Sequence, residues 1–381
     1  MTHETITSVE ALYLRSPHVN EDRTDSSQDA LLVRIETSSG NVGWGEVDSN
    51  PLVAKAVIEA PTSHTRARGL RDVLIGQDPL DITRLWHDMY EATLYFGRSG
   101  AVIHAMAGVD IALWDLKGKI LNKSVASLIG GSYVDRLRAY ASHMFSFTPE
   151  ETAKRAAAAA SEGFTALKFG WEPFGADADL DLSFVEALRQ TVGPNVDLMI
   201  DAGLAWDAKT AISRARSFEP YQLFWLEEPV APDDLAGYAR IAGSTSTRIA
   251  AGEEECEFRG FTRLMDYGRI DVVQIDITRT GITEALHIAR LANDRKLQVA
   301  NHNFTTDINT AAALHVLSSI PNALILEYCV EHNPMKDSLI ENPIKLDDGF
   351  AVVPTEPGLG VTVSSEAVRT YGVATSSALS I

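Results

Sequence analysis

From Leu137 onward, short apolar runs follow one another at intervals of roughly 25–30 residues. The stretches between them, such as 149–162 and 282–294, carry apolar residues at helical spacing. Strands that alternate with helices at this interval predict an α/β barrel of parallel strands with the helices outside. The eight runs are residues 138–143, 164–169, 196–200, 223–226, 248–251, 272–275, 297–300 and 323–326.

The first third of the chain has a different pattern. Residues 5–15, 30–37 and 42–47 alternate as strands do, with a turn at 38–41, and residues 101–121 have helical spacing. A polar loop, 16–29, separates the first two strands. We predict an α+β domain over 1–136, the barrel over 137–345, and a tail over 346–381 that returns to the first domain.

Charge and composition exclude several classes of partner. The net charge of −19 opposes binding to nucleic acid or an anionic membrane, because both require a basic surface. The opening residues do not resemble a secretory signal, and no apolar run reaches the length of a membrane span. Only Cys256 and Cys329 occur, which favours a reducing cytoplasm. We expect a homo-oligomer acting on a small-molecule carboxylate.

Ionisable residues stand directly after most of the predicted barrel strands. Barrel enzymes carry their chemistry where the strands end, so side chains at these positions should converge on the mouth of the barrel. From the third strand to the eighth, the residues are Asp201, Glu227, Glu253, Asp276, His302 and Glu327.

The first three of these residues predict a metal site. Carboxylates on adjacent strands repel one another unless a cation lies between them, and Mg²⁺ suits a site with few carboxylates and open positions. We propose Asp201, Glu227 and Glu253 as ligands of one Mg²⁺ per subunit. Spacing alone leaves the neighbouring Glu228, Glu254 and Glu255 open as alternatives.

The next two strand ends predict a general base. A carboxylate beside an imidazole orients the ring and raises its basicity, so Asp276 and His302 form a candidate dyad. On the second strand, Lys168 would place an ammonium over the mouth, where it could bind a carboxylate or an enediolate.

Several short motifs, in order along the chain, resemble the mandelate racemase subgroup of the enolase superfamily. The resemblance runs over essentially the whole chain. The motifs are Val42-Gly43-Trp44-Gly45-Glu46, Asp110-Ile111-Ala112-Leu113-Trp114-Asp115, Trp225-Leu226-Glu227-Glu228-Pro229, Ala251-Gly252-Glu253, Gln274-Ile275-Asp276 with Arg279 and Gly281, and Pro357-Gly358-Leu359-Gly360.

This resemblance implies a modified (β/α)7β barrel whose mouth is covered by an α+β capping domain, made by the N-terminal third and the C-terminal tail. It implies that Glu227 and Glu253 are metal ligands, that Asp276 and His302 are the basic dyad, and that Glu327 binds the substrate carboxylate. The capping domain would then carry residues that recognise the distal end of the substrate. The candidates for substrate binding are His18, Arg23, Arg98 and Asn303.

Two positions depart from the subgroup. Its second barrel strand usually carries two lysines, the second of which is a base facing the histidine, but this chain keeps only Lys168 and has Gly170 at the second position. Asp201-Ala202-Gly203 also lacks the asparagine common at its third position. A chain with one evident base is poorly equipped for racemisation, which needs an acid on the opposite face.

Dehydration needs only one face, because His302 can remove the α-proton and then protonate the departing β-hydroxyl. Since acid sugars are a common substrate class of the family, we predict dehydration of an aldonate or aldarate to a 2-keto-3-deoxy acid. Epimerisation or lactone cycloisomerisation is the alternative. A barrel that binds metal and ligand without turnover is a more remote one.

Overall fold

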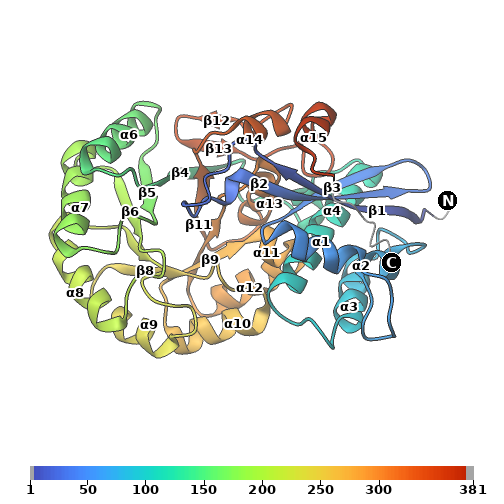
Figure 1. The fold of residues 1–381 in the computed structure, drawn as a ribbon, viewed down its shortest axis with the longest axis horizontal. Helices are drawn as coiled ribbons and strands as arrows, with labels where there is room; N and C mark the ends of the chain where they lie inside the picture. The colour runs from blue at the N-terminus through green and yellow to red at the C-terminus, as the bar shows by residue number, and fades with distance from the viewer. Residues whose placement is uncertain (1–3, 375–381) are drawn as a thin grey trace.

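The centre of the computed structural model, which describes residues 4–374, is a closed barrel of parallel strands (Figure 1). Successive strands are hydrogen-bonded in chain order, and the last returns to pair with the first. Each predicted run overlaps one strand, so the barrel prediction is confirmed. The strands are β4 (Arg136–Met144), β5 (Ala166–Gly170), β6 (Asp197–Asp201), β7 (Trp225–Glu227), β8 (Arg248–Ala251), β9 (Val272–Asp276), β10 (Gln298–His302) and β11 (Ala323–Cys329).

Helices on the outside connect these strands. Many begin at a polar side chain that caps the first turn: Thr148 accepts from the Glu151 N–H, and Asp177 and Asp207 cap the next two helices in the same way. The helix that follows the last barrel strand is the short α14 (Pro334–Leu339). The connecting helices are α6 (Pro149–Ser161), α7 (Ala178–Val192), α8 (Ala208–Phe218), α9 (Leu235–Ala242), α10 (Phe258–Arg263), α11 (Ile277–Thr280), α12 (Ile282–Asp294) and α13 (Asp307–Ser318).

The N-terminal third forms a separate α+β unit, the capping domain, on the right of Figure 1. Its antiparallel sheet contains β1 (Ile6–Arg15), β2 (Asp29–Thr37) and β3 (Val42–Val47), with the predicted turn at 38–41. The glycines of β3 allow close packing on the long helix, because a Cβ on Gly45 would lie 2.0 Å from the Gly108 carbonyl. The helices are α1 (Pro51–Glu59), α2 (Leu70–Leu74), α3 (Ile82–Ala92), α4 (Ala101–Leu121) and α5 (Val125–Ile129).

The C-terminal tail contacts both units. The hairpin of β12 (Leu346–Asp347) and β13 (Phe350–Val352) pairs with barrel strand β4. Further on, after α15 (Ser365–Tyr371), the N–H of Val373 donates to the Tyr13 carbonyl of β1 at 2.8 Å.

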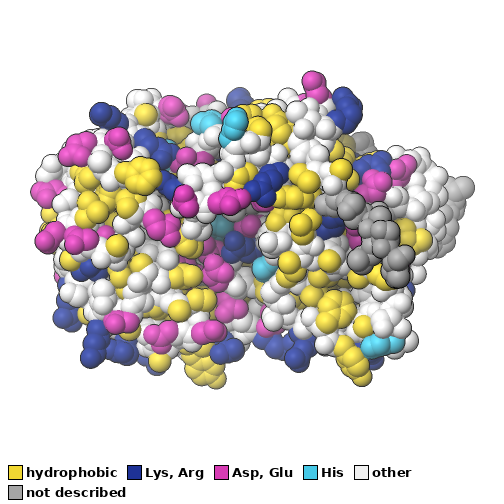
Figure 2. All heavy atoms as spheres, viewed as in Figure 1, with side chains coloured by type: hydrophobic (Ala, Val, Ile, Leu, Met, Phe, Trp, Pro, Cys, Tyr) yellow, Lys and Arg dark blue, Asp and Glu magenta, His cyan; other side chains and the backbone are white. Residues whose placement is uncertain are grey.

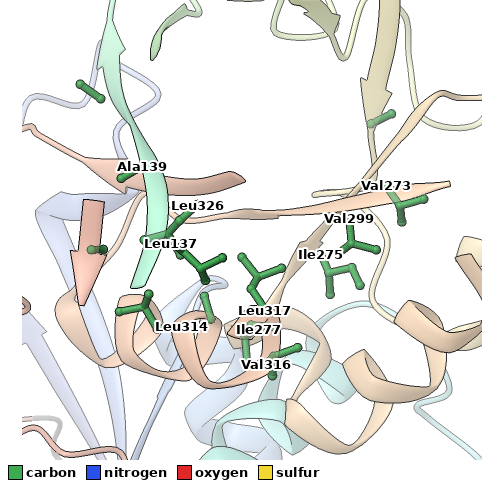
Figure 3. Close-up of a cluster of buried hydrophobic side chains, with 14 of the residues drawn as sticks. Leu137, Ala139, Val273, Ile275, Ile277, Val299, Leu314, Val316, Leu317 and Leu326 are labelled. Atoms are coloured by element: carbon green, nitrogen blue, oxygen red, sulfur yellow. The ribbon is translucent and has the colours of Figure 1, made fainter. Parts of the chain in front are cut away.

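Apolar side chains on the outside of the strands pack against the helices. Figure 3 shows one part of this core, where Leu137 and Leu326 of the barrel lie beside Leu314 and Leu317 of α13. On the surface seen in Figure 2, carboxylates are interspersed with lysine and arginine side chains. Among the described residues, no helix is long and apolar enough to cross a membrane.

Candidate active site

The polar residues of the barrel lie above an apolar layer in its interior. This layer contains one side chain from each strand. Because side chains alternate between the faces of a strand, the residue two positions further on also points inward. The residues two positions beyond this layer are Ser142, Lys168, Asp201, Glu227, Gly252, Gln274, His302 and Glu327.

Asp201, Glu227 and Glu253 form a buried group, here called the carboxylate cluster, with ligand oxygens within 4.8 Å of one another. Asp201 and Glu227 are register partners on β6 and β7, and Glu253 follows Gly252, whose φ of 135° turns the chain after β8. Burial and the charge of Glu227 raise the pKa of Asp201 well above its usual range, and burial raises the pKa of Glu253 to about 7. Oxygens that disfavour one another's charge in this way fit a hard dication.

The structure distinguishes Glu227 from its neighbour Glu228. The Oε1 of Glu228 accepts from the Gly252 N–H at 2.9 Å, and the Tyr238 hydroxyl donates to Oε2. Burial raises the pKa of Glu228 to about 8. Glu227 also accepts hydrogen bonds, from Lys168 and from the Trp225 indole, but Glu227 and not Glu228 lies with Asp201 and Glu253 in the carboxylate cluster.

Lys168 adds a fixed positive charge beside the cluster. Its Nζ lies 2.5 Å from Glu227 Oε1 and 2.7 Å from Glu327 Oε1. Burial alone would lower the pKa of Lys168, but these two carboxylates outweigh it and hold the pKa well above the usual range. The second oxygen of Glu327 accepts from the Asn303 N–H at 2.6 Å. Lys168 and Glu327 are thus held in place on the inner wall.

His302 and Asp276 form the predicted pair, here called the dyad. The His302 Nδ1 lies 2.6 Å from Asp276 Oδ2, and Oδ1 of the same carboxylate accepts from the Thr278 N–H at 2.7 Å. The other ring nitrogen, Nε2, lies 3.4 Å from Glu253. Burial lowers the pKa of His302, but Glu253 and Asp276 raise it to about 10. A dication bound by Glu253 would offset that carboxylate and lower this pKa again.

Gly170 lies against the carboxylate cluster, which explains the absence of a side chain there. It is the register partner of Asp201. A Cβ at Gly170 would lie 2.7 Å from Asp201 Oδ2 and 2.8 Å from Asp201 Cβ. Gly203, the other departure, has a φ of +56°, and a Cβ there would lie 3.0 Å from the Trp171 ring. Both positions are restricted by neighbours that line the site.

A cavity of about 100 Å³ opens above the carboxylate cluster and the dyad. Its walls combine the ionisable groups with apolar side chains, and two residues of the polar loop of the capping domain form part of the lining. The barrel contributes Lys168, Asp201, Glu253, Glu254, Arg279 and His302 with Ser142, His143, Met144, Gly170, Trp171 and Phe304, and the loop contributes Thr24 and Ser26.

The four candidates for substrate binding do not line this cavity. The Arg23 guanidinium donates to the Phe145 carbonyl at 2.8 Å, and the Asn303 amide donates to Thr310 at 2.7 Å. His18 and Arg98 are exposed. The sequence predicts that the loop lies near the barrel mouth, but it does not identify the loop residues that line the cavity. The missed lining residues include Thr24, Ser26, Ser142, Trp171 and Arg279, of which Ser142 could have been found from strand alternation.

Comparison with known families matches both parts of the chain. Residues 2–130 match the mandelate racemase/muconate lactonizing enzyme N-terminal domain, and residues 151–368 match the enolase C-terminal domain-like family.

Characterised relatives match over nearly the full length. The chain is 31% identical to a D-galactarolactone cycloisomerase of Agrobacterium fabrum, over 90% of each protein. It is also 31% identical to a D-xylonate dehydratase of Haloferax volcanii, over 93% of this chain and 88% of that protein. The crystal structure of the 3,6-anhydro-D-galactonate cycloisomerase from Zobellia galactanivorans superposes with a TM-score of 0.88 at 32% identity, covering 97% of this chain and 100% of that one.

Proposed function

Because the chain belongs to the mandelate racemase/muconate lactonizing enzyme family of the enolase superfamily, we propose that it is a Mg²⁺-dependent hydro-lyase that dehydrates an acid sugar. The observation that carries this proposal is the one-sided placement of bases. The dyad stands on β9 and β10 beside the carboxylate cluster, while Gly170 of β5 has no room for a second base. Relatives named as dehydratases of D-gluconate, D-xylonate and arabinonate support the same class.

In the proposed reaction, His302 removes the proton next to the substrate carboxylate through Nε2. Asp276 accepts the hydrogen bond from Nδ1, so the ring keeps Nε2 free to act as the base. The Lys168 ammonium stabilises the negative charge that grows on the substrate, and a protonated Glu327 would donate a hydrogen bond to the substrate carboxylate. His302 then returns its proton to the departing β-hydroxyl on the same face, which releases water and leaves the enol of a 2-keto-3-deoxy acid.

The carboxylate cluster is the proposed site of one Mg²⁺. Oε2 of Glu253 accepts no hydrogen bond among the described residues and lies 3.4 Å from His302 Nε2, so this oxygen is available to a cation. Three carboxylates leave further positions on Mg²⁺ open, and the bound ion supplies positive charge to the substrate carboxylate.

The experiment that tests this function is a screen of mono-acid and di-acid sugars for formation of a 2-keto acid. We expect turnover of at least one sugar acid with Mg²⁺, loss of turnover with EDTA, and recovery when Mg²⁺ is restored. The His302→Asn variant serves as a matched inactive control. Turnover that survives complete removal of divalent metal would refute the metal-dependent mechanism.

Cycloisomerisation is the second candidate, because two of the relatives described above are named as cycloisomerases. It begins with the same proton abstraction, but the departing β-oxygen belongs to a ring and stays attached to the product. The screen therefore includes sugar lactones and anhydro sugar acids. A product with the mass of its substrate, formed only from cyclic compounds, would favour this function over dehydration.

We also propose that the protein works in the cytoplasm as a homo-oligomer. Its two cysteines are buried and unpaired, as suits a reducing compartment. Light scattering of the purified protein would test the assembly.

A further inference from the structure

The end of capping strand β3 reaches the barrel elements that hold the dyad. Glu46 is the fifth residue of β3 and Asp48 follows the strand, and both side chains are buried. Because the residues are two positions apart, they project to the same side. The inference drawn from this contact rests on the proposed function, because the catalytic role of the dyad comes from that proposal.

Asp48 forms an ion pair with Arg279 of α11, across the boundary between the two domains. Its Oδ2 accepts from the Arg279 Nε at 3.1 Å, and Nη2 lies 3.0 Å from the same oxygen. Only 16% of the arginine side chain and 8% of the aspartate side chain are exposed, so the pair is little screened by water. Ligand atoms of Asp48, Asp276 and His302 lie within 4.8 Å of one another.

Arg279 contacts both the carboxylate cluster and the dyad. Its Nη1 donates to the backbone carbonyl of Glu253 at 2.8 Å. Its own backbone N–H donates to Asp276 Oδ1 at 3.2 Å. A displacement of Arg279 would therefore disturb a residue of the carboxylate cluster and the residue that orients His302.

Glu46 makes the second contact, at the start of α13. The Thr306 hydroxyl donates to Glu46 Oε2 at 2.7 Å, and Thr306 caps the helix that carries Asn309. The Asn309 side chain donates to Asp276 Oδ1 at 3.4 Å and to Thr278 Oγ1 at 3.2 Å. Through Asp48 and Glu46, the capping domain thus contacts two of the elements that hold Asp276.

We propose that Asp48 is a positioning residue for the dyad, acting through Arg279. Asp48 does not belong to the cavity lining found among residues 4–374, whereas Arg279 does. The capping domain then contributes to the chemical step as well as covering the mouth. The Asp48–Arg279 ion pair joins the capping domain to the barrel and also helps to align Asp276.

The test uses the Asp48→Asn variant of the full chain, which keeps the shape of the side chain but removes its charge. We expect kcat to fall about 10-fold to 100-fold, because Arg279 would no longer hold Asp276 in place, and Mg²⁺ affinity to fall as well, because Arg279 also holds the Glu253 carbonyl. Exchange of the substrate α-proton with D₂O should fall in parallel. The Asp48→Glu variant should recover part of the loss.

A second readout does not require the substrate to be known. We expect the proton between His302 Nδ1 and Asp276 to give a low-field NMR resonance, because the two atoms lie 2.6 Å apart, and this resonance should shift or broaden in Asp48→Asn. The control is Trp114→Phe, which removes another contact between the domains, the 3.0 Å hydrogen bond to Thr283, without touching the dyad. It should leave the resonance and kcat unchanged.

The outcomes separate this inference from the proposed function. If no acid sugar is turned over but the resonance changes in Asp48→Asn alone, the positioning role stands and the dehydratase proposal fails. If the variant folds with an unchanged resonance, the positioning role is overturned. The role is overturned equally if Trp114→Phe produces the same change, because the effect would then be general to the domain contact.

Discussion

Substitution of Gly170 by alanine should weaken metal binding through Asp201, although Gly170 is not itself a ligand. The added Cβ would lie 2.7 Å from Asp201 Oδ2, where an ordinary contact begins at 3.4 Å, so the oxygen must move by about 0.7 Å, the difference between the two. Rotation of the side chain cannot relieve the clash completely. The Asp201 Cβ, which is fixed to the backbone, would lie only 2.8 Å away.

A shift of this size matters because Mg²⁺ requires near-octahedral ligands at about 2.0–2.1 Å. Disturbing residues that orient a metal ligand costs about 10-fold to 100-fold in affinity, which corresponds to about 1.4–2.7 kcal/mol. We expect a loss in this range for Gly170→Ala. A lysine at this position would meet the same clash, so Gly170→Lys should not create a two-base racemase.

The assay is calorimetric titration of Mg²⁺ into the metal-free protein, with circular dichroism to verify the fold. Gly243→Ala is the matched control, because this glycine ends α9 with a φ of −78° and lies outside the site. It should bind Mg²⁺ as the wild type does. If folded Gly170→Ala also binds Mg²⁺ with wild-type affinity, the packing argument and the assignment of Asp201 as a ligand are both wrong.

Four further predictions follow from the geometry. Glu227→Gln should weaken Mg²⁺ binding and nearly abolish turnover with the fold intact, because an amide is a poor ligand for a hard dication; calorimetry with wild-type affinity would contradict this. His302→Asn should remove both turnover and α-proton exchange with D₂O, and exchange that persisted with metal bound would reveal a second base. Burial raises the pKa of Glu46 to about 8 from a usual value of 4.5, so the folded state keeps a proton that the unfolded state loses between these values. Stability therefore falls as pH rises through this window, by up to about 1.4 kcal/mol per unit, and Glu46→Gln should flatten this dependence of the melting temperature. Replacing Arg23 and Arg98 by alanine tests their predicted role in reading the substrate, and an unchanged kcat/KM for the best substrate would remove them as specificity residues.

The barrel and most of its candidate active-site residues could be predicted, because both follow from the local pattern of apolar residues along the chain. A run of apolar residues ends where a strand ends, and parallel strands in a barrel bring their ends to one mouth. Asp201, Glu227 and His302 are the last residues of β6, β7 and β10. Their meeting therefore needed only the order of the strands, which the sequence periodicity contains.

Spacing left the choice between adjacent glutamates open, the family resemblance favoured Glu227, and the tertiary contacts show how the two residues differ. Spacing could not separate Glu227 from Glu228, because both are glutamates at the end of the same predicted strand. In the structure, Tyr238 and Gly252 donate hydrogen bonds to Glu228. Those donors come from α9 and from the turn after β8, and no pattern near Glu228 indicates them.

The loop residues and the contact between the domains were also decided only by the tertiary structure. Arg23 was predicted to face the substrate, but its guanidinium binds the Phe145 carbonyl, and Thr24 lines the cavity instead. Asp48 and Arg279 are 231 residues apart, and their ion pair exists because β3 docks beside α11. Strand periodicity determines the face on which a side chain lies, but a loop has no period. In a loop, the direction of each side chain is set by the partners that the fold brings to it.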